Sequence, residues 1–105
     1  MYIAEAHPAD EWQMDSNKTD KFVFNQPREL EERRALAHLL PDRLKYRITV
    51  ALDPMNALAD RAYSAWPERI YVIATGGRIA YKAEPGPFGF EPAQAEKALK
   101  RLLTP

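Results

Sequence analysis

The pattern of apolar and polar positions divides the chain into short strand-like runs and longer helix-like stripes. An apolar start at residues 2–4 predicts a strand, and the nearly continuous apolar runs at residues 48–52 and 70–73 are typical of strands covered on both faces. Residues 78–82 alternate instead, which predicts a strand nearer an edge of the sheet. A Gly-Gly pair between the last two runs predicts a hairpin turn.

Three stretches with an apolar residue at every third or fourth position predict helices. The first opens at Pro27, has acidic residues before basic ones and ends at Pro41. The second follows Asp53, a predicted N-cap with a proline directly after it, and runs to Trp66. The third opens at Pro92. The apolar stripe of the second helix comprises Met55, Leu58, Ala59, Ala62, Tyr63 and Trp66.

Two segments between these elements predict surface loops. Residues 13–26 are polar and aperiodic apart from a short strand-like run at 22–24, and residues 84–90 are rich in Pro and Gly. The predicted order is therefore β-α-β-α-β-β-α, with helical crossovers first and a hairpin near the end. This order predicts one α/β domain over residues 1–105 that contains most of a thioredoxin-like fold.

Composition narrows the classes of partner. Fifteen basic and fifteen acidic residues give a formal net charge of zero without segregation of sign, which argues against nucleic acid and against an anionic membrane surface. No signal-peptide pattern and no apolar stretch approaching the ~20 residues of a membrane helix occur, so we expect a soluble, cytoplasmic protein. The absence of cysteine excludes disulfides, thiolate metal sites and cysteine nucleophiles within these residues.

Candidate chemistry gathers directly after the first predicted strand, where Glu5, His7, Asp10 and Trp12 follow one another closely. Functional groups in open α/β sheets lie beyond the carboxyl ends of strands. A histidine titrates near neutrality, and a carboxylate two residues away could orient it as a general acid, although a hydrogen-bonded structural pair remains the alternative. A divalent metal at Glu5, His7 and Asp10 is conceivable, but a chain with two histidines and no cysteine favours no metal site.

Four blocks and a Gly-Pro pair carry a resemblance over essentially all 105 residues. In chain order they are Tyr2-Ile3-x-Glu5-Ala6-His7-Pro8-x-Asp10-x-Trp12, Arg28-x-Leu30-Glu31-x-Arg33, Leu52-Asp53-x-Met55, Ala62-Tyr63-x-Ala65-Trp66-x-Glu68-Arg69-Ile70-Tyr71-Val72-Ile73, and Gly86-Pro87. Together they resemble the iodothyronine deiodinases, selenoenzymes built on a thioredoxin fold. The resemblance implies a central sheet with helices on both faces.

The activity implied by this resemblance is reductive removal of iodide from an iodinated phenol. A selenocysteine, or a cysteine in some relatives, attacks the iodine, and a thiol co-substrate regenerates it without a bound cofactor. The resemblance places that nucleophile upstream of Tyr2, on a central strand between those at residues 2–5 and 70–73.

We therefore expect the carboxyl-terminal part of a deiodinase-like enzyme that lacks its nucleophile and is inactive alone. A misplaced gene start and a genuinely short protein are both consistent with this expectation. The rival expectation is a non-catalytic thioredoxin-like binding or dimerisation module, which has lost its nucleophile and has closed its sheet or dimerised. The truncated chain, in contrast, is expected to be marginally stable or to associate, for example as a homodimer, through its open sheet edge.

The same resemblance assigns roles to residues near the first strand. It implies that Glu5 and His7 handle protons and that Tyr2 belongs to their network, although strand alternation points Tyr2 and Glu5 to opposite faces unless the strand bends. Core packing is the alternative role for Tyr2. Asp10 and Trp12 are expected either to fix the loop and wall a binding pocket, or only to cap and pack it.

Three prolines and a histidine complete the set of candidates. Pro67 precedes a predicted strand, as does the cis-proline that faces the nucleophile in thioredoxin-like proteins, but it could equally stop a helix. Pro27 and Pro85 stand where the family has a substrate-binding histidine and a polar or basic residue. These two departures favour a substrate other than iodothyronine itself. His38 lies within a predicted helix and is expected to be exposed or packed rather than a ligand.

Overall fold

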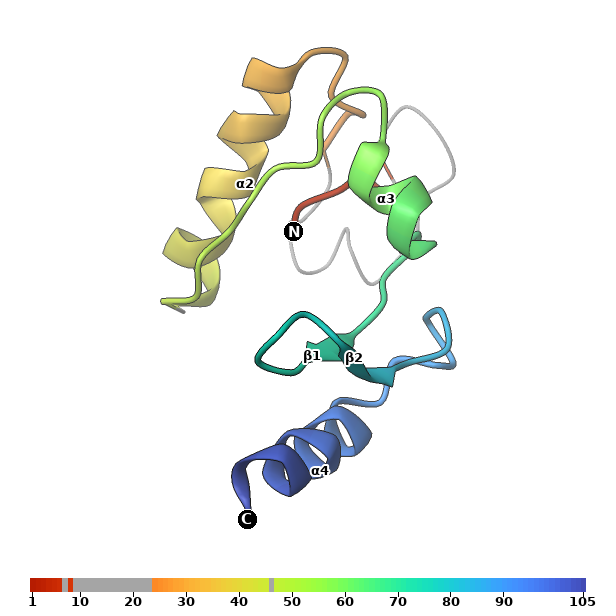
Figure 1. Ribbon diagram of the computed structural model, residues 1–105. Coiled ribbons are helices and arrows are strands. Elements are labelled where there is room, and N and C mark those ends of the chain that lie inside the picture. The colour runs from red at the N-terminus through yellow and green to blue at the C-terminus, as the bar shows by residue number, and fades with distance from the viewer. Residues whose placement is uncertain (7, 9–23, 46) are drawn as a thin grey trace. The chain divides into compact units, whose positions relative to one another are not determined.

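The computed structural model describes residues 1–6, 8, 24–45 and 47–105 (Figure 1). Its elements, in chain order, are α2 (Leu30–Leu44), α3 (Leu58–Tyr63), β1 (Tyr71–Ile73), β2 (Ile79–Lys82) and α4 (Pro92–Leu103). Helices and an antiparallel pair of strands confirm the predicted α/β class. The chain divides into two compact units, Met1–Tyr63 and Ser64–Pro105, which we describe separately. A single domain and a thioredoxin-like arrangement stay predictions.

The helix α2 begins three residues later than Pro27, the predicted start. The carboxylate of Glu32 accepts the backbone N–H of Arg28 at 2.7 Å, which satisfies an amide just ahead of the first turn. Glu29, the residue before the helix, has an extended backbone with φ −142° and ψ 164°. Pro27 is therefore a buried residue of the preceding segment rather than the first residue of the helix.

The other end of α2 also corrects the prediction, because Pro41 lies inside the helix. A proline lacks the N–H that would bond to the fourth carbonyl before it, but its own carbonyl can still accept a bond. Here Pro41 O accepts the N–H of Lys45 at 2.9 Å, and Lys45 adopts a left-handed conformation with φ 57°. The helix therefore ends at Leu44 in a left-handed C-cap rather than at the proline.

The helix α3 is much shorter than the predicted helix that runs to Trp66. The N–H of Ala57 bonds to Pro54 O at 2.9 Å, and Ala57 has a positive φ of 57°, so residues 54–57 form a turn. Ser64 has a positive φ of 48° directly after the helix. Apolar periodicity identified this helix correctly, but the turns at both ends limit it to Leu58–Tyr63.

The two first predicted strands form a single parallel bridge, between Tyr2 and Leu52. The N–H of Tyr2 bonds to Ala51 O at 2.7 Å, and the N–H of Asp53 bonds to Tyr2 O at 2.9 Å. The parallel direction agrees with the prediction for residues 48–52. The prediction that residues 48–52 are buried on both faces was wrong, because Ile48 is 69% exposed.

The second unit contains a β-hairpin with a helix packed on it. β1 and β2 pair antiparallel, with Tyr71 opposite Lys82, and Figure 1 shows α4 beside this pair. Gly76 and Gly77 have φ values of 97° and 84°, which a tight turn requires and which glycine adopts without strain. The hairpin and α4 confirm the predicted elements of the carboxyl-terminal third of the chain, but the predicted burial of residues 70–73 on both faces was wrong, because Ile73 is 50% exposed. Ala83 is nearly fully buried in this unit.

Candidate active site

The first unit brings two of the predicted site residues into direct contact. The hydroxyl of Tyr2 donates a hydrogen bond to the Glu5 carboxylate. The chain bends at Ala4 and Ala6, so residues 2–6 do not continue as a regular strand. Alternation along a straight strand would separate Tyr2 and Glu5, and the bend is the condition under which the sequence allowed the two side chains to meet.

The backbone of Glu5 is fixed by a side chain from another segment. Gln26 accepts the Glu5 N–H through its Oε1 at 2.9 Å and donates from its Nε2 to Glu5 O at 3.0 Å. The side-chain amide of Gln26 thus bonds to both the backbone N–H and the backbone carbonyl of Glu5, the two groups that a neighbouring strand would otherwise pair. Glu5 is therefore held by Gln26 at its backbone and by Tyr2 at its side chain.

The electrostatic environment of Glu5 favours the protonated acid. Burial raises the pKa of the Glu5 carboxyl above its ordinary value of 4.5, and the positive charge of Arg33 offsets part of that rise. A carboxyl with a raised pKa keeps its proton at a higher pH and can donate it in a reaction.

An apolar pocket of about 260 Å³ lies beside the Tyr2–Glu5 pair. Tyr2 and Glu5 supply its polar groups, and its other lining residues are Phe24, Leu36, Leu39, Leu40 and Leu44. A pocket with apolar walls and a few polar groups at one place is typical of small-molecule sites. The arrangement can bind an apolar ring and present an acid to it.

Two buried charged residues in this unit were not predicted as site residues. Arg33 is 4% exposed, and its Nη1 donates to Asp53 O at 2.6 Å and to Pro54 O at 3.0 Å. Asp53 is fully buried, and its two carboxylate oxygens accept the N–H groups of Ala59 at 2.7 Å and Asp60 at 3.1 Å. Asp53 therefore caps α3, as the sequence suggested, but across the turn at residues 54–57.

Comparison of the sequence with known proteins shows which family the chain resembles. The sequence profile of the family described as iodothyronine deiodinase matches residues 1–103. Type I iodothyronine deiodinase of Xenopus laevis is 37% identical over 101 residues, which are 96% of this chain and 38% of that protein. The thyroxine 5-deiodinases of Rattus norvegicus and Homo sapiens are 35% and 34% identical, over 96% of this chain and 32% of each relative.

The chain belongs to the iodothyronine deiodinase family. This confirms the resemblance that the sequence blocks carry. The matched region spans 38% and 32% of the first two relatives, so it corresponds to only part of each of those deiodinases.

Of the remaining predicted site residues of this deiodinase-family chain, the structure describes only one. His7, Asp10 and Trp12 lie outside the described residues, so their predicted roles stay predictions. Pro67 lies in the second unit, and the Trp66–Pro67 peptide bond is cis. Its predicted part in binding stays a prediction, as does the catalytic role of Tyr2 and Glu5.

The described residues offer neither a cluster of metal ligands nor a membrane-spanning helix. Among them, no group of three His, Cys, Asp or Glu side chains could hold a metal ion. Two members of the conceivable triad at Glu5, His7 and Asp10 lie outside this part of the chain. Within the described ranges no helix is both long and apolar enough to cross a bilayer. His38 is exposed on α2, as expected.

The raised pKa of Glu5 predicts a specific pH dependence of stability in this deiodinase-family chain. A carboxyl whose pKa is higher in the folded state than in the unfolded state stabilises the fold fully below the unfolded value, and that contribution is lost as the pH rises through the folded value. Glu5→Gln should abolish this loss, whereas Glu29→Gln, an exposed control, should retain it. Urea unfolding at a series of pH values measures the free energy of unfolding of wild type and of both variants. Equal pH profiles for wild type and Glu5→Gln would contradict the assignment.

Proposed function

We propose that this chain is the carboxyl-terminal part of a deiodinase-like oxidoreductase that removes iodide from an iodinated phenol. The observation that carries the proposal is the Tyr2–Glu5 pair, a hydrogen-bonded acid of raised pKa at the polar end of an apolar pocket. Membership of the deiodinase family supports an iodinated phenolic substrate. The prolines at positions 27 and 85 favour a phenol other than iodothyronine.

The proposed reaction needs a nucleophile, a proton and two electrons. A selenolate or thiolate attacks the iodine, so the carbon–iodine bond breaks and a selenium–iodine or sulfur–iodine bond forms. The ring carbon keeps the electron pair of the broken bond and takes a proton, which Glu5 supplies with His7 as its relay partner. Two thiols then reduce the nucleophile–iodine bond and are oxidised to a disulfide, which regenerates the selenolate or thiolate and releases iodide and two protons, one of which restores the acid. The net change converts an aryl iodide and two thiols into an arene, hydrogen iodide and a disulfide.

The nucleophile must come from outside these residues, because the 105-residue sequence contains no cysteine. We propose that it lies on a segment upstream of Tyr2, on a strand of a thioredoxin-like sheet. The parallel bridge between Tyr2 and Leu52 supports a strand in this region. A thiol reductant and a cytoplasmic location belong to the same proposal.

The test compares this chain with a longer one. The 105 residues, and the same residues extended by the in-frame upstream sequence, are incubated with a monocyclic iodinated phenol and a dithiol, and released iodide is measured. We expect release only from the extended protein, and only while its selenocysteine or cysteine is intact. Iodide release by the 105 residues alone would overturn the external nucleophile, and an inert extended protein would overturn the reaction.

One observation favours a second candidate function, a non-catalytic binding module that dimerises through a strand edge. Within the described part of the second unit the sheet has two strands, so β1 has one edge without a strand partner there. Exposed strand edges are sites where another chain can pair. Iodide release by the extended protein separates the two candidates, and light scattering over a range of concentrations tests the edge, because a monomer at all concentrations excludes dimerisation through it.

A further inference from the structure

Arg33 carries a charge that its own hydrogen bonds do not compensate. Its side chain is 4% exposed, and both acceptors of its Nη1 are backbone carbonyls, which have no net charge. Its Nε has no hydrogen-bond partner among the residues that the structure describes. A buried cation is costly unless an anion lies close to it. The role of Arg33 therefore depends on which carboxylate compensates its buried positive charge.

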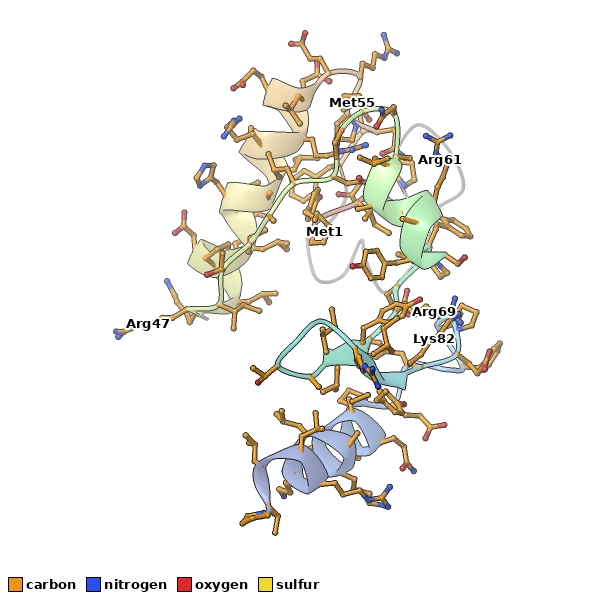
Figure 2. All side chains as sticks on the ribbon, viewed as in Figure 1. Met1, Arg47, Met55, Arg61, Arg69 and Lys82 are labelled. Carbon is orange, nitrogen blue, oxygen red and sulfur yellow. The ribbon has the colours of Figure 1, made fainter. Side chains whose placement is uncertain are left out.

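Two carboxyl groups are relevant to this charge. The carboxylate of Asp53 is already bonded to the N–H groups of Ala59 and Asp60 at the start of α3. The positive charge of Arg33 lowers the pKa of the Glu5 carboxyl and so offsets part of the rise that burial causes. In contrast, Arg47 and Arg61 are exposed, and Figure 2 shows their side chains extending outward.

Arg33 is also linked to the Tyr2–Glu5 pair through the backbone. Asp53 accepts the bond from Arg33 at its carbonyl and donates its N–H to Tyr2 O at 2.9 Å. The hydroxyl of Tyr2 in turn donates to Glu5. Two hydrogen bonds at the backbone of Asp53 thus tie Arg33 to Tyr2, and the side chain of Tyr2 bonds to Glu5.

We propose that Arg33 is a positioning residue for the Tyr2–Glu5 pair, which it holds by clamping the backbone at Asp53 and by placing a buried positive charge near the Glu5 carboxyl. The value of this role to catalysis rests on the function proposed above, but the clamp and the charge are properties of the chain alone. Gln26 and the pocket leucines are neutral, so among the described groups around Glu5 the ionisable ones are Tyr2 and Arg33.

The charge of Arg33 and the burial of Glu5 act in opposite directions. Burial makes the carboxyl hold its proton, whereas a nearby guanidinium stabilises the carboxylate that remains after the proton leaves. An acid that gives up a proton and must regain it in each turnover needs both states to be accessible. Arg33 would stabilise the deprotonated carboxylate of Glu5.

The experiment is a carbon-13 NMR titration of the Glu5 side-chain carboxyl in the 105-residue chain, with amide hydrogen exchange of Asp53 measured on the same samples. Arg33→Met removes the charge and keeps an apolar stem, and Arg33→Lys keeps a charge. Arg33→Gln replaces Arg33→Met if the latter does not fold. Arg34→Met is the matched control, because the neighbouring Arg34 side chain is 51% exposed.

In the charge-free variant we expect the midpoint of Glu5 to rise by about one pH unit or more. Protection of the Asp53 amide against hydrogen exchange should fall at least about tenfold. A tenfold change corresponds to about 1.4 kcal/mol, close to the lower end of what a hydrogen bond to a charged group contributes. Arg33→Lys should restore the Glu5 midpoint, and Arg34→Met should change neither value. A folded charge-free variant with the wild-type Glu5 midpoint would overturn the proposal, because a purely structural arginine would leave that midpoint in place. Neither measurement requires turnover, so the result is independent of whether iodide is released.

Discussion

Replacing Asp53 by alanine should destabilise the first unit by about 3 kcal/mol, because two backbone N–H groups lose their acceptor in a fully buried place. Each unsatisfied buried donor costs about 1–3 kcal/mol, and a carboxylate at a helix start adds a favourable charge–dipole interaction. The same substitution should melt α3, whose six residues are too few to be stable as an isolated helix. Denaturant unfolding followed by circular dichroism measures the loss, and hydrogen exchange at Ala59 and Asp60 locates it.

Two control variants define the origin of that effect. Asp53→Asn retains one oxygen acceptor, so its loss should be about half that of Asp53→Ala. Asp42→Ala removes an exposed carboxylate from α2 and should change stability by no more than about 0.5 kcal/mol. If Asp53→Ala unfolds at the same denaturant concentration as Asp42→Ala, the carboxylate of Asp53 does not hold α3.

The parts of the fold that were predictable from sequence are those that local chemistry decides. The hairpin at residues 71–82 depends on two glycines that accept positive φ values, and α4 depends on an apolar stripe that begins at a proline. The boundaries of α2 and α3 were less predictable. They depend on a side chain that accepts the N–H of Arg28, and on positive φ values at Ala57 and Ser64, which are not glycines.

The pairing of Tyr2 with Glu5 could be anticipated only in part. Family resemblance placed both in one proton network, while strand alternation placed them on opposite faces. The bends at Ala4 and Ala6 reconcile the two, and nothing in the residue types of this segment requires a bend there. Gln26, which holds the Glu5 backbone, lay in a segment whose polarity predicted only a surface loop.

Arg33 and Asp53 were missed as parts of the site because charged residues are normally exposed. A usable indication existed for Arg33, which lies four and seven positions before Ala37 and Leu40 and so shares their helix face. A basic residue at an apolar position predicts a buried charge that needs a partner. The acceptors of Arg33, which are carbonyls twenty and twenty-one positions away, could not be found by spacing.

Glu5→Gln should lower the rate of iodide release by about 10²-fold or more in the extended protein that carries its nucleophile. The glutamine keeps the size of the side chain and can still accept the hydrogen bond from Tyr2, but it has no acidic proton to donate. Tyr2→Phe should have a smaller effect, because it removes only the donor that orients the acid. Single-turnover formation of the deiodinated phenol, measured at saturating iodinated phenol and without dithiol, isolates this step from regeneration by thiol.

The control and the pH profile decide whether Glu5 acts as the acid. Glu29→Gln changes an exposed carboxylate on the same unit and should leave the rate unchanged. In wild type the rate should fall as the pH rises through the raised pKa of Glu5, because the protonated form is the donor. Glu5→Gln should remove that fall along with most of the rate. A Glu5→Gln variant that keeps both the wild-type rate and the wild-type pH profile would move the proton donor to another residue, and His7 would then be the next to test.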